Sequence, residues 1–258
     1  MKTTVAGLDV QVQGSGEPVL LVHGSGGGPD SWTLVAAELA ESFEVWTFVR
    51  RGYGPGPAPA TFAEEVPDLQ ALLDAIERPA RVVGASLGAT LVLHAALSDP
   101  RGMRSLALFE PPLLLPGQHL HGVRARYEVL TAAGDHAKAG LLLAREVIHL
   151  PEELVALLAN APGPDPVDAH REARGWIGDL RQLAADTTDT ARWSAITLPT
   201  LLMQGADTWP PIPEGVEALA RALPHVERLA WEGQSHFVTM TAPHLFAAAV
   251  AEFAHRQV

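Results

Sequence analysis

Short apolar runs recur along the first 110 residues and return near the C-terminal end of the chain. Several of these runs, such as VLLV, VWTFV, LALF and TLLM, are apolar throughout and do not alternate with polar residues. Uninterrupted apolar runs of this length are typical of strands buried on both faces of a parallel sheet. The predicted strands are Thr3–Gln13, Pro18–His23, Phe43–Val49, Arg81–Gly84, Ser105–Phe109, Pro199–Gln204 and Val226–Trp231.

Segments with helical spacing of apolar residues separate these strands. They are Ser31–Glu41, Phe62–Ile76, Leu87–Leu97, Glu214–Ala222 and Pro243–His255. Regular alternation of strands and helices predicts an α/β fold, with a mostly parallel, twisted sheet and helices on both of its faces. The first segment differs, because residues 3–13 alternate polar and apolar residues around Gly7, which favours an antiparallel hairpin at the sheet edge.

The alternation stops between residues 111 and 195, where only helical patterns occur. A Pro/Gly-rich linker, Ala161–Pro166, interrupts them. An all-helical insertion between two strands of one sheet is most simply a cap over one end of that sheet, and a separate helical domain is the alternative. The predicted organisation is therefore a core domain of residues 1–110 and 196–258, with a helical cap of residues 111–195.

Composition narrows the classes of function. The 258 residues carry a formal net charge of −12 and include no cysteine, which excludes disulfides, thiolate metal sites and cysteine nucleophiles. A negative field repels phosphate backbones and anionic lipid, so we expect neither nucleic acid nor a membrane as a partner. The chain shows neither a signal-peptide pattern nor an apolar stretch of 18 residues. We expect a soluble cytoplasmic protein, and the arginine- and alanine-rich composition suggests a bacterial one.

The segment VVGASLGA contains a G-x-S-x-G pattern centred on Ser86. It follows a predicted strand and opens a predicted helix, which is the context of a nucleophile elbow. The tight turn requires small neighbours, supplied by Gly84 and Gly88, and it exposes the serine hydroxyl. It also directs the backbone amide of Leu87 toward a carbonyl oxygen under attack. The alternative is a Gly/Ser turn without chemistry.

A second glycine-rich segment, LLVHGSGGGPDSW, follows another predicted strand. It lacks the third glycine of a dinucleotide-binding loop, because Pro29 stands there, and it lacks the Lys-Ser/Thr pair of a phosphate-binding P-loop. The remaining use is to supply the second backbone donor of an oxyanion hole, from Ser25 or alternatively from Gly24. His23 is predicted to be a hydrogen-bonded structural residue beneath the site.

Serine needs a base to accept its proton, and His236 in the segment WEGQSHFVTMTAP is the candidate. It lies in a loop of small residues after the last predicted strand and before a helix. Another histidine pair, His119 and His121, has a spacing that could suit a metal ion. No acidic ligands accompany that pair, so we expect no metal site.

These motifs, in this order and over essentially the whole chain, resemble the α/β-hydrolase superfamily, in particular its serine hydrolases with a helical lid. The resemblance implies that Ser86 is the nucleophile and His236 the base. It leaves the acid open between two carboxylates. In most of the family the acid follows the seventh strand, three residues beyond a strand-end glycine, but here Thr208 occupies that place and Asp207 stands one position earlier.

Glu110 is the competing acid, at the end of the sixth predicted strand and beside two prolines. Zearalenone lactonases and certain haloalkane dehalogenases resemble this chain in taking their acid from that position. A carboxylate that ends an apolar strand is costly to bury without a partner, which favours a role for Glu110. Asp207 has a simple alternative role as a turn residue.

The resemblance implies a cofactor-independent serine hydrolase that cleaves an ester, lactone or thioester of an apolar or aromatic small molecule through an acyl-Ser86 intermediate. We expect no cofactor and no metal, a small apolar ester or lactone as the partner, and a monomer or homodimer. Trp176 of the cap is a candidate substrate contact. The alternatives are a cofactor-free acyltransferase or cyclase, a C–C hydrolase, and a non-catalytic small-molecule receptor on the same fold.

Overall fold

The computed structural model describes residues 1–54, 56–161 and 165–256. Its centre is an eight-stranded sheet with the order β1-β2-β4-β3-β5-β6-β7-β8. The β1–β2 and β2–β4 pairs are antiparallel, and all other neighbouring strands are parallel. The mostly parallel sheet and its antiparallel edge hairpin are thus confirmed. The strands are β1 (Lys2–Val5), β2 (Leu8–Gly14), β3 (Glu17–Val22), β4 (Phe43–Phe48), β5 (Ala80–Ala85), β6 (Met103–Phe109), β7 (Thr200–Gly205) and β8 (Val226–Trp231).

The uninterrupted apolar runs exist because the central strands are covered on both faces. In β3, Leu20 and Val22 join one hydrophobic cluster, whereas Val19 and Leu21 join the other. Successive side chains of a strand point to opposite faces, so a strand between two helical layers needs apolar residues at every position. All four of these side chains are fully buried.

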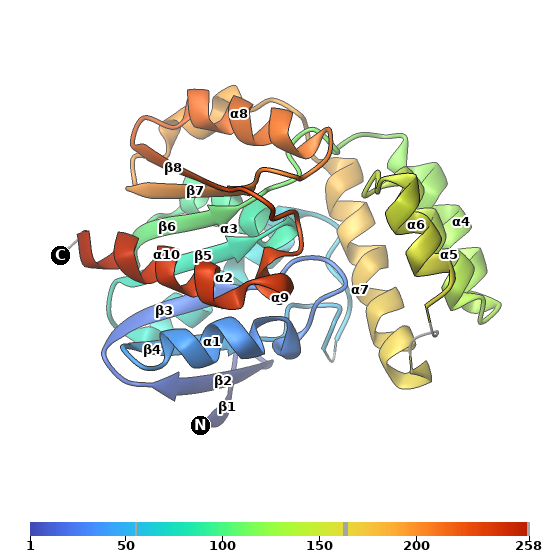
Figure 1. The fold of residues 1–258 in the computed structure, drawn as a ribbon. Helices are drawn as coiled ribbons and strands as arrows, with labels where there is room; N and C mark the ends of the chain where they lie inside the picture. The colour runs from blue at the N-terminus through green and yellow to red at the C-terminus, as the bar shows by residue number, and fades with distance from the viewer. Residues whose placement is uncertain (55, 162–164, 257–258) are drawn as a thin grey trace.

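Helices form a layer on each face of the sheet. One layer contains α1 and α10, which lie in front of the sheet in Figure 1, and the other contains α2, α3 and α8. Their bounds are α1 (Thr33–Leu39), α2 (Phe62–Ile76), α3 (Leu87–Ser98), α8 (Ile212–Ala222) and α10 (Pro243–Arg256), with the short α9 (Val238–Thr241) before α10. None of the helices in the described ranges is both long and apolar enough to cross a membrane.

The predicted helix Ser31–Glu41 is wrong at both ends. A short 3-10 helix, η1 (Pro29–Trp32), precedes α1, which ends at Leu39. Gly28 before η1 has extended backbone, and Pro29 at the first helical position has its φ already set for a helical turn. The glycine-rich segment therefore passes directly into helical structure.

Between β6 and β7 the described residues form helices and no strand. These are α4 (Leu120–Ala132), α5 (His136–Glu146), α6 (Glu152–Ala159), α7 (Pro166–Ala185) and η2 (Ala191–Ala195). Helix α4 packs against α5 and α7, and Figure 1 shows α7 standing between the sheet and the other three helices. Residues 162–164 of the predicted linker lie outside the described residues, and Pro166 begins α7. The division into core and cap domains stays a prediction.

Candidate active site

The turn between β5 and α3 holds Ser86 in a strained conformation, with φ +53° and ψ −126°. Its amide donates to the carbonyl of Phe109 at 2.8 Å, which ties the turn to the end of β6. A Cβ on Gly84 would lie 2.6 Å from the Cα of Ala89, and one on Gly88 would lie 2.3 Å from the carbonyl oxygen of Val22. The spacing of the two glycines is therefore a steric requirement of this turn.

Three side chains that follow the carboxyl ends of β5, β6 and β8 form one chain of hydrogen bonds. The Ser86 hydroxyl donates to Nε2 of His236 at 3.1 Å, and His236 Nδ1 donates to Oε2 of Glu110 at 2.5 Å. His236 follows β8, and its ring stacks on Phe109 at a centroid distance of 5.8 Å. The carboxyl ends of parallel strands are where open α/β sheets bind their ligands.

Glu110 is fully buried, and its other oxygen is also paired. Oε1 accepts hydrogen bonds from the amide of Gly205 at 2.7 Å and from the hydroxyl of Thr208 at 2.6 Å. Because both of these groups donate, Glu110 acts as a hydrogen-bond acceptor. In the bond between Glu110 Oε2 and His236 Nδ1 we therefore assign the proton to Nδ1. The Nε2 lone pair of His236 then faces Ser86.

Asp207 takes no part in the hydrogen bonds that link Ser86, His236 and Glu110. Its side chain is exposed and has no hydrogen-bond partner among the described residues, while its backbone amide donates to the carbonyl of Gln234 at 2.9 Å. The structure therefore brings Glu110, and not Asp207, to His236. Thr208, at the place where most of the family carries its acid, instead donates to Glu110.

Ser25 and Leu87 are the predicted sources of the two backbone donors of an oxyanion hole. Both residues line one cavity together with Ser86 and His236. In the described part of the chain neither amide has a hydrogen-bond partner, whereas the amide of Gly26 is taken by the Tyr53 hydroxyl. Gly24, the alternative donor, does not line this cavity and lies instead in a larger cavity that also reaches Ser86.

Two cavities meet at Ser86. The smaller one, of about 130 Å³, extends toward the helical insertion and is lined mostly by apolar side chains, Trp176 among them. The larger one, of about 610 Å³, runs between the glycine-rich loop and α9. They share Ser25, Ser86, His236 and Phe237. A substrate bound at Ser86 can therefore extend in two directions.

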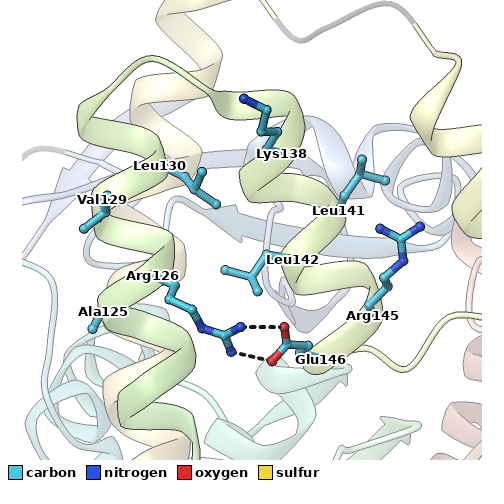
Figure 2. Close-up of a pocket in the computed structure, with 9 residues that line it drawn as sticks. All are labelled: Ala125, Arg126, Val129, Leu130, Lys138, Leu141, Leu142, Arg145 and Glu146. Carbon is cyan, nitrogen blue, oxygen red and sulfur yellow. Dashed lines mark hydrogen bonds and ion pairs between the residues drawn. The ribbon is translucent and has the colours of Figure 1, made fainter.

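A third cavity, of about 640 Å³, lies between α4 and α5 (Figure 2). It shares no lining residue with the two cavities at Ser86. Its charged side chains pair with acidic or basic neighbours, as in the Arg126–Glu146 pair, and Arg145 and Lys138 pair with Glu152 and Asp135. No serine, threonine or histidine lines this cavity, so it offers no hydroxyl nucleophile with a base and is not the candidate site.

A buried polar network, which no motif in the sequence indicates, lies behind the glycine-rich loop. Arg50 donates to Glu65 at 2.9 Å and to Asp179 of α7 at 3.0 Å, and the hydroxyl of Tyr53 donates to Asp179 at 2.6 Å. Burial alone would lower the pKa of Arg50, but the two carboxylates raise it on balance. Arg50 and Asp179 lie 129 positions apart, so no local pattern links them.

His23 lies fully buried between this network and the loop. Its Nε2 accepts from the amide of Arg50 at 3.0 Å, so its Nδ1 is the donor to the carbonyl of Gly24 at 2.8 Å. Burial, and secondly the charge of Arg50, lower the pKa of His23 to about 3. The ring is therefore neutral near pH 7 and serves as a structural hydrogen-bonding residue, as predicted.

The low pKa of His23 predicts a loss of stability in acid. Between pH 6.5 and pH 3 the unfolded chain binds a proton at this histidine and the folded chain does not, so the free energy of unfolding falls as the pH drops through that range. The contribution amounts to several kcal/mol. Urea unfolding at pH 7, 5 and 4 should show a smaller fall for His23→Asn than for wild type. His225→Asn, which removes an exposed imidazole, should keep the wild-type dependence, and an equal fall in all three proteins would contradict the prediction.

An eight-stranded, mostly parallel sheet with helices on both faces, an insertion after β6 and a serine elbow after β5 is the architecture of an α/β hydrolase. The chain belongs to the alpha/beta hydrolase family, whose sequence model matches residues 19–249. Its relatives, described below, support a hydrolase of this type.

The chain is 30% identical over 258 residues to a pimeloyl-[acyl-carrier protein] methyl ester esterase of Chromobacterium violaceum, a match that covers 97% of this chain and 99% of that protein. It is 35% identical over 125 residues to the uncharacterized hydrolase YraK of Bacillus subtilis, covering 45% of this chain and only 44% of that protein. The solved structure of an alpha/beta hydrolase from Sphaerobacter thermophilus superposes with a TM-score of 0.79 at 29% identity, covering 98% of this chain and 99% of the other.

Proposed function

We propose that the protein is a cofactor-independent serine hydrolase that cleaves an ester, lactone or thioester of an apolar small molecule. The observation that carries the proposal is the continuous chain of hydrogen bonds from Glu110 through His236 to Ser86, at the junction of two cavities. The C. violaceum relative, named an esterase, supports the same class of reaction.

In this mechanism Ser86 Oγ attacks the carbonyl carbon while Nε2 of His236 takes the hydroxyl proton. The negative charge that develops on the carbonyl oxygen is stabilised by the amides of Ser25 and Leu87. When the bond to the leaving group breaks, His236 returns the proton to the leaving oxygen or sulfur. Water then attacks the acyl-Ser86 carbonyl by the same route and releases the acid. Glu110 remains ionised throughout and stabilises the imidazolium form of His236.

The shape of the site supports a substrate with one compact apolar group. The cavity under the cap measures about 130 Å³ and is lined by side chains such as Leu115, Ile148 and Leu183. An apolar cavity of about 150 Å³ accepts a molecule the size of benzene. We therefore infer that one of the groups flanking the scissile bond is no larger than a phenyl ring or a short branched chain, with Trp176 at its side. The other group lies in the larger cavity.

Two series of esters test this proposal. In one series the acyl group grows from two to ten carbons with a constant alcohol, and in the other the alcohol grows with a constant acyl group. We expect kcat/KM to fall by about tenfold or more beyond about six carbons in one series, because each clash or displaced side chain costs about 1–3 kcal/mol. The other series should show little dependence on size.

Ile148→Ala widens the smaller cavity and should move the cutoff to longer chains. Leu157→Ala, a change at an exposed leucine of α6, should leave the cutoff in place. Absence of turnover across both series in folded wild-type protein would contradict the hydrolase proposal, and equal tolerance of size in both series would contradict the assignment of the small cavity.

A further inference from the structure

The orientation of the Ser25 amide depends on the two peptide groups that flank this residue. The first joins Gly24 to Ser25 and contains the N–H proposed above as an oxyanion donor. The second joins Ser25 to Gly26. A glycine-rich loop has little intrinsic preference for one orientation of these groups, so other residues must hold them.

His23 holds the first peptide group. Its Nδ1 donates to the carbonyl of Gly24 at 2.8 Å, and Arg50 fixes the ring through its backbone amide. In a planar trans peptide the C=O and the N–H point in opposite directions. A Gly24 carbonyl turned toward His23 therefore leaves the N–H of Ser25 turned away from His23.

Tyr53 holds the second peptide group. The amide of Gly26 donates to the Tyr53 hydroxyl at 2.8 Å, and that hydroxyl donates to Oδ2 of Asp179 at 2.6 Å. Both residues are almost fully buried. Burial, and then the charge of Asp179, raise the pKa of Tyr53 well above its ordinary value, so the phenol keeps its proton. One hydroxyl thus connects the loop to a carboxylate.

That carboxylate belongs to α7 of the helical insertion and not to the sheet. Arg50 holds Oδ1 of Asp179 at 3.0 Å, which leaves Oδ2 for Tyr53. The helix also touches the ring directly, because a Cβ on Gly175 would lie 2.2 Å from Cε1 of Tyr53. Tyr53 therefore contacts both the loop and α7.

We propose that Tyr53, held by Asp179 of α7, is a positioning residue that keeps the Ser25 amide aimed at the carbonyl oxygen of the substrate. The inference rests on the proposed function. Without the phenol hydroxyl the Gly26 amide lacks its acceptor, and the Ser25–Gly26 peptide can rotate. Loss of one oxyanion donor costs about 10²- to 10³-fold in kcat. A loosened donor should cost less, about 10- to 100-fold.

Tyr53→Phe tests this directly, since it removes one oxygen and keeps the ring. The matched control is Tyr127→Phe on α4, which removes a hydroxyl that has no hydrogen-bond partner in the described part of the chain. With an ester that wild type hydrolyses, we expect Tyr53→Phe to lower kcat by about 10- to 100-fold and to change KM by less than about threefold. Tyr127→Phe should retain the wild-type constants, and Asp179→Asn should lower kcat in the same direction as Tyr53→Phe.

A second readout separates positioning from general loosening of the site. A trifluoromethyl ketone forms a tetrahedral adduct with the serine and uses the oxyanion hole, whereas the matching methyl ketone binds without an adduct. Tyr53→Phe should weaken binding of the trifluoromethyl ketone by the same factor by which it lowers kcat/KM. Binding of the methyl ketone should stay unchanged. Unchanged kcat in folded Tyr53→Phe, or equal weakening of both ketones, would overturn the proposal while leaving the hydrolase function intact. A wild type that neither hydrolyses esters nor reacts with a fluorophosphonate probe would overturn the proposed function, and this inference with it.

Discussion

Replacing Ser86 with alanine is expected to lower ester turnover by about 10⁴- to 10⁶-fold, because no covalent intermediate can then form. The remaining rate would come from the oxyanion donors and from binding of the substrate. The substitution removes one oxygen that donates to His236 at 3.1 Å, and the backbone contacts of the turn, including the bond from the Ser86 amide to Phe109, do not depend on it. The variant should therefore fold normally.

The measurement is kcat/KM for the best ester of the two series, together with mass spectrometry after treatment with a fluorophosphonate probe. Wild type should gain one adduct on Ser86, and Ser86→Ala should gain none. Ser98→Ala, at the far end of α3 and exposed, should behave as wild type in both assays. Turnover of Ser86→Ala within tenfold of wild type would show that another group attacks the substrate.

The fold follows from local patterns, which explains why it could be predicted. Parallel strands between two helical layers need apolar residues at every position, and the resulting runs mark β3 to β7 in the sequence. The predicted helix Phe62–Ile76 coincides with α2. The turn at Ser86 is equally local, because its glycines are required by contacts within a few residues of chain and with the end of β3.

The network behind the loop could not be predicted in this way. Tyr53 lies in a turn after β4, and its partner Asp179 lies 126 positions later on a helix of the insertion. Neither residue carries a spacing that distinguishes it from an ordinary surface residue. Their burial results from the way α7 packs over the loop, which is a property of the whole fold.

The choice of acid depends on tertiary contacts for the same reason. In the sequence, Glu110 and Asp207 each follow an apolar strand, so the pattern does not decide which of them is the acid that pairs with His236. The structure separates them through donors from β7 and the turn after it: Gly205 and Thr208 saturate one oxygen of Glu110 and leave the other for His236. Glu110 also adopts φ +45°, a left-handed conformation that a sequence pattern of this kind does not reveal.

We expect Glu110→Gln to lower kcat by about 10³- to 10⁴-fold, while Asp207→Asn changes it by less than about threefold. Glutamine keeps the shape of the side chain but removes the charge that stabilises the imidazolium of His236. If its amide nitrogen faces His236, it favours the tautomer with the proton on Nε2, which cannot take the serine proton. If it faces the other side, it meets the amide donor of Gly205. Asp207→Asn is the matched control, because it makes the same carboxylate-to-amide change on an exposed side chain nearby.

Circular dichroism and thermal unfolding must first show that both variants are folded, and kcat is then measured with the ester used for Ser86→Ala. A loss confined to Asp207→Asn would reverse the assignment, since His236 would then have to take its acid from the turn after β7 during catalysis. Similar, modest losses in both variants would mean that neither carboxylate stabilises the imidazolium. The full loss in Glu110→Gln alone would place the acid after β6, where Thr208 supports it from the position that carries the acid in most of the family.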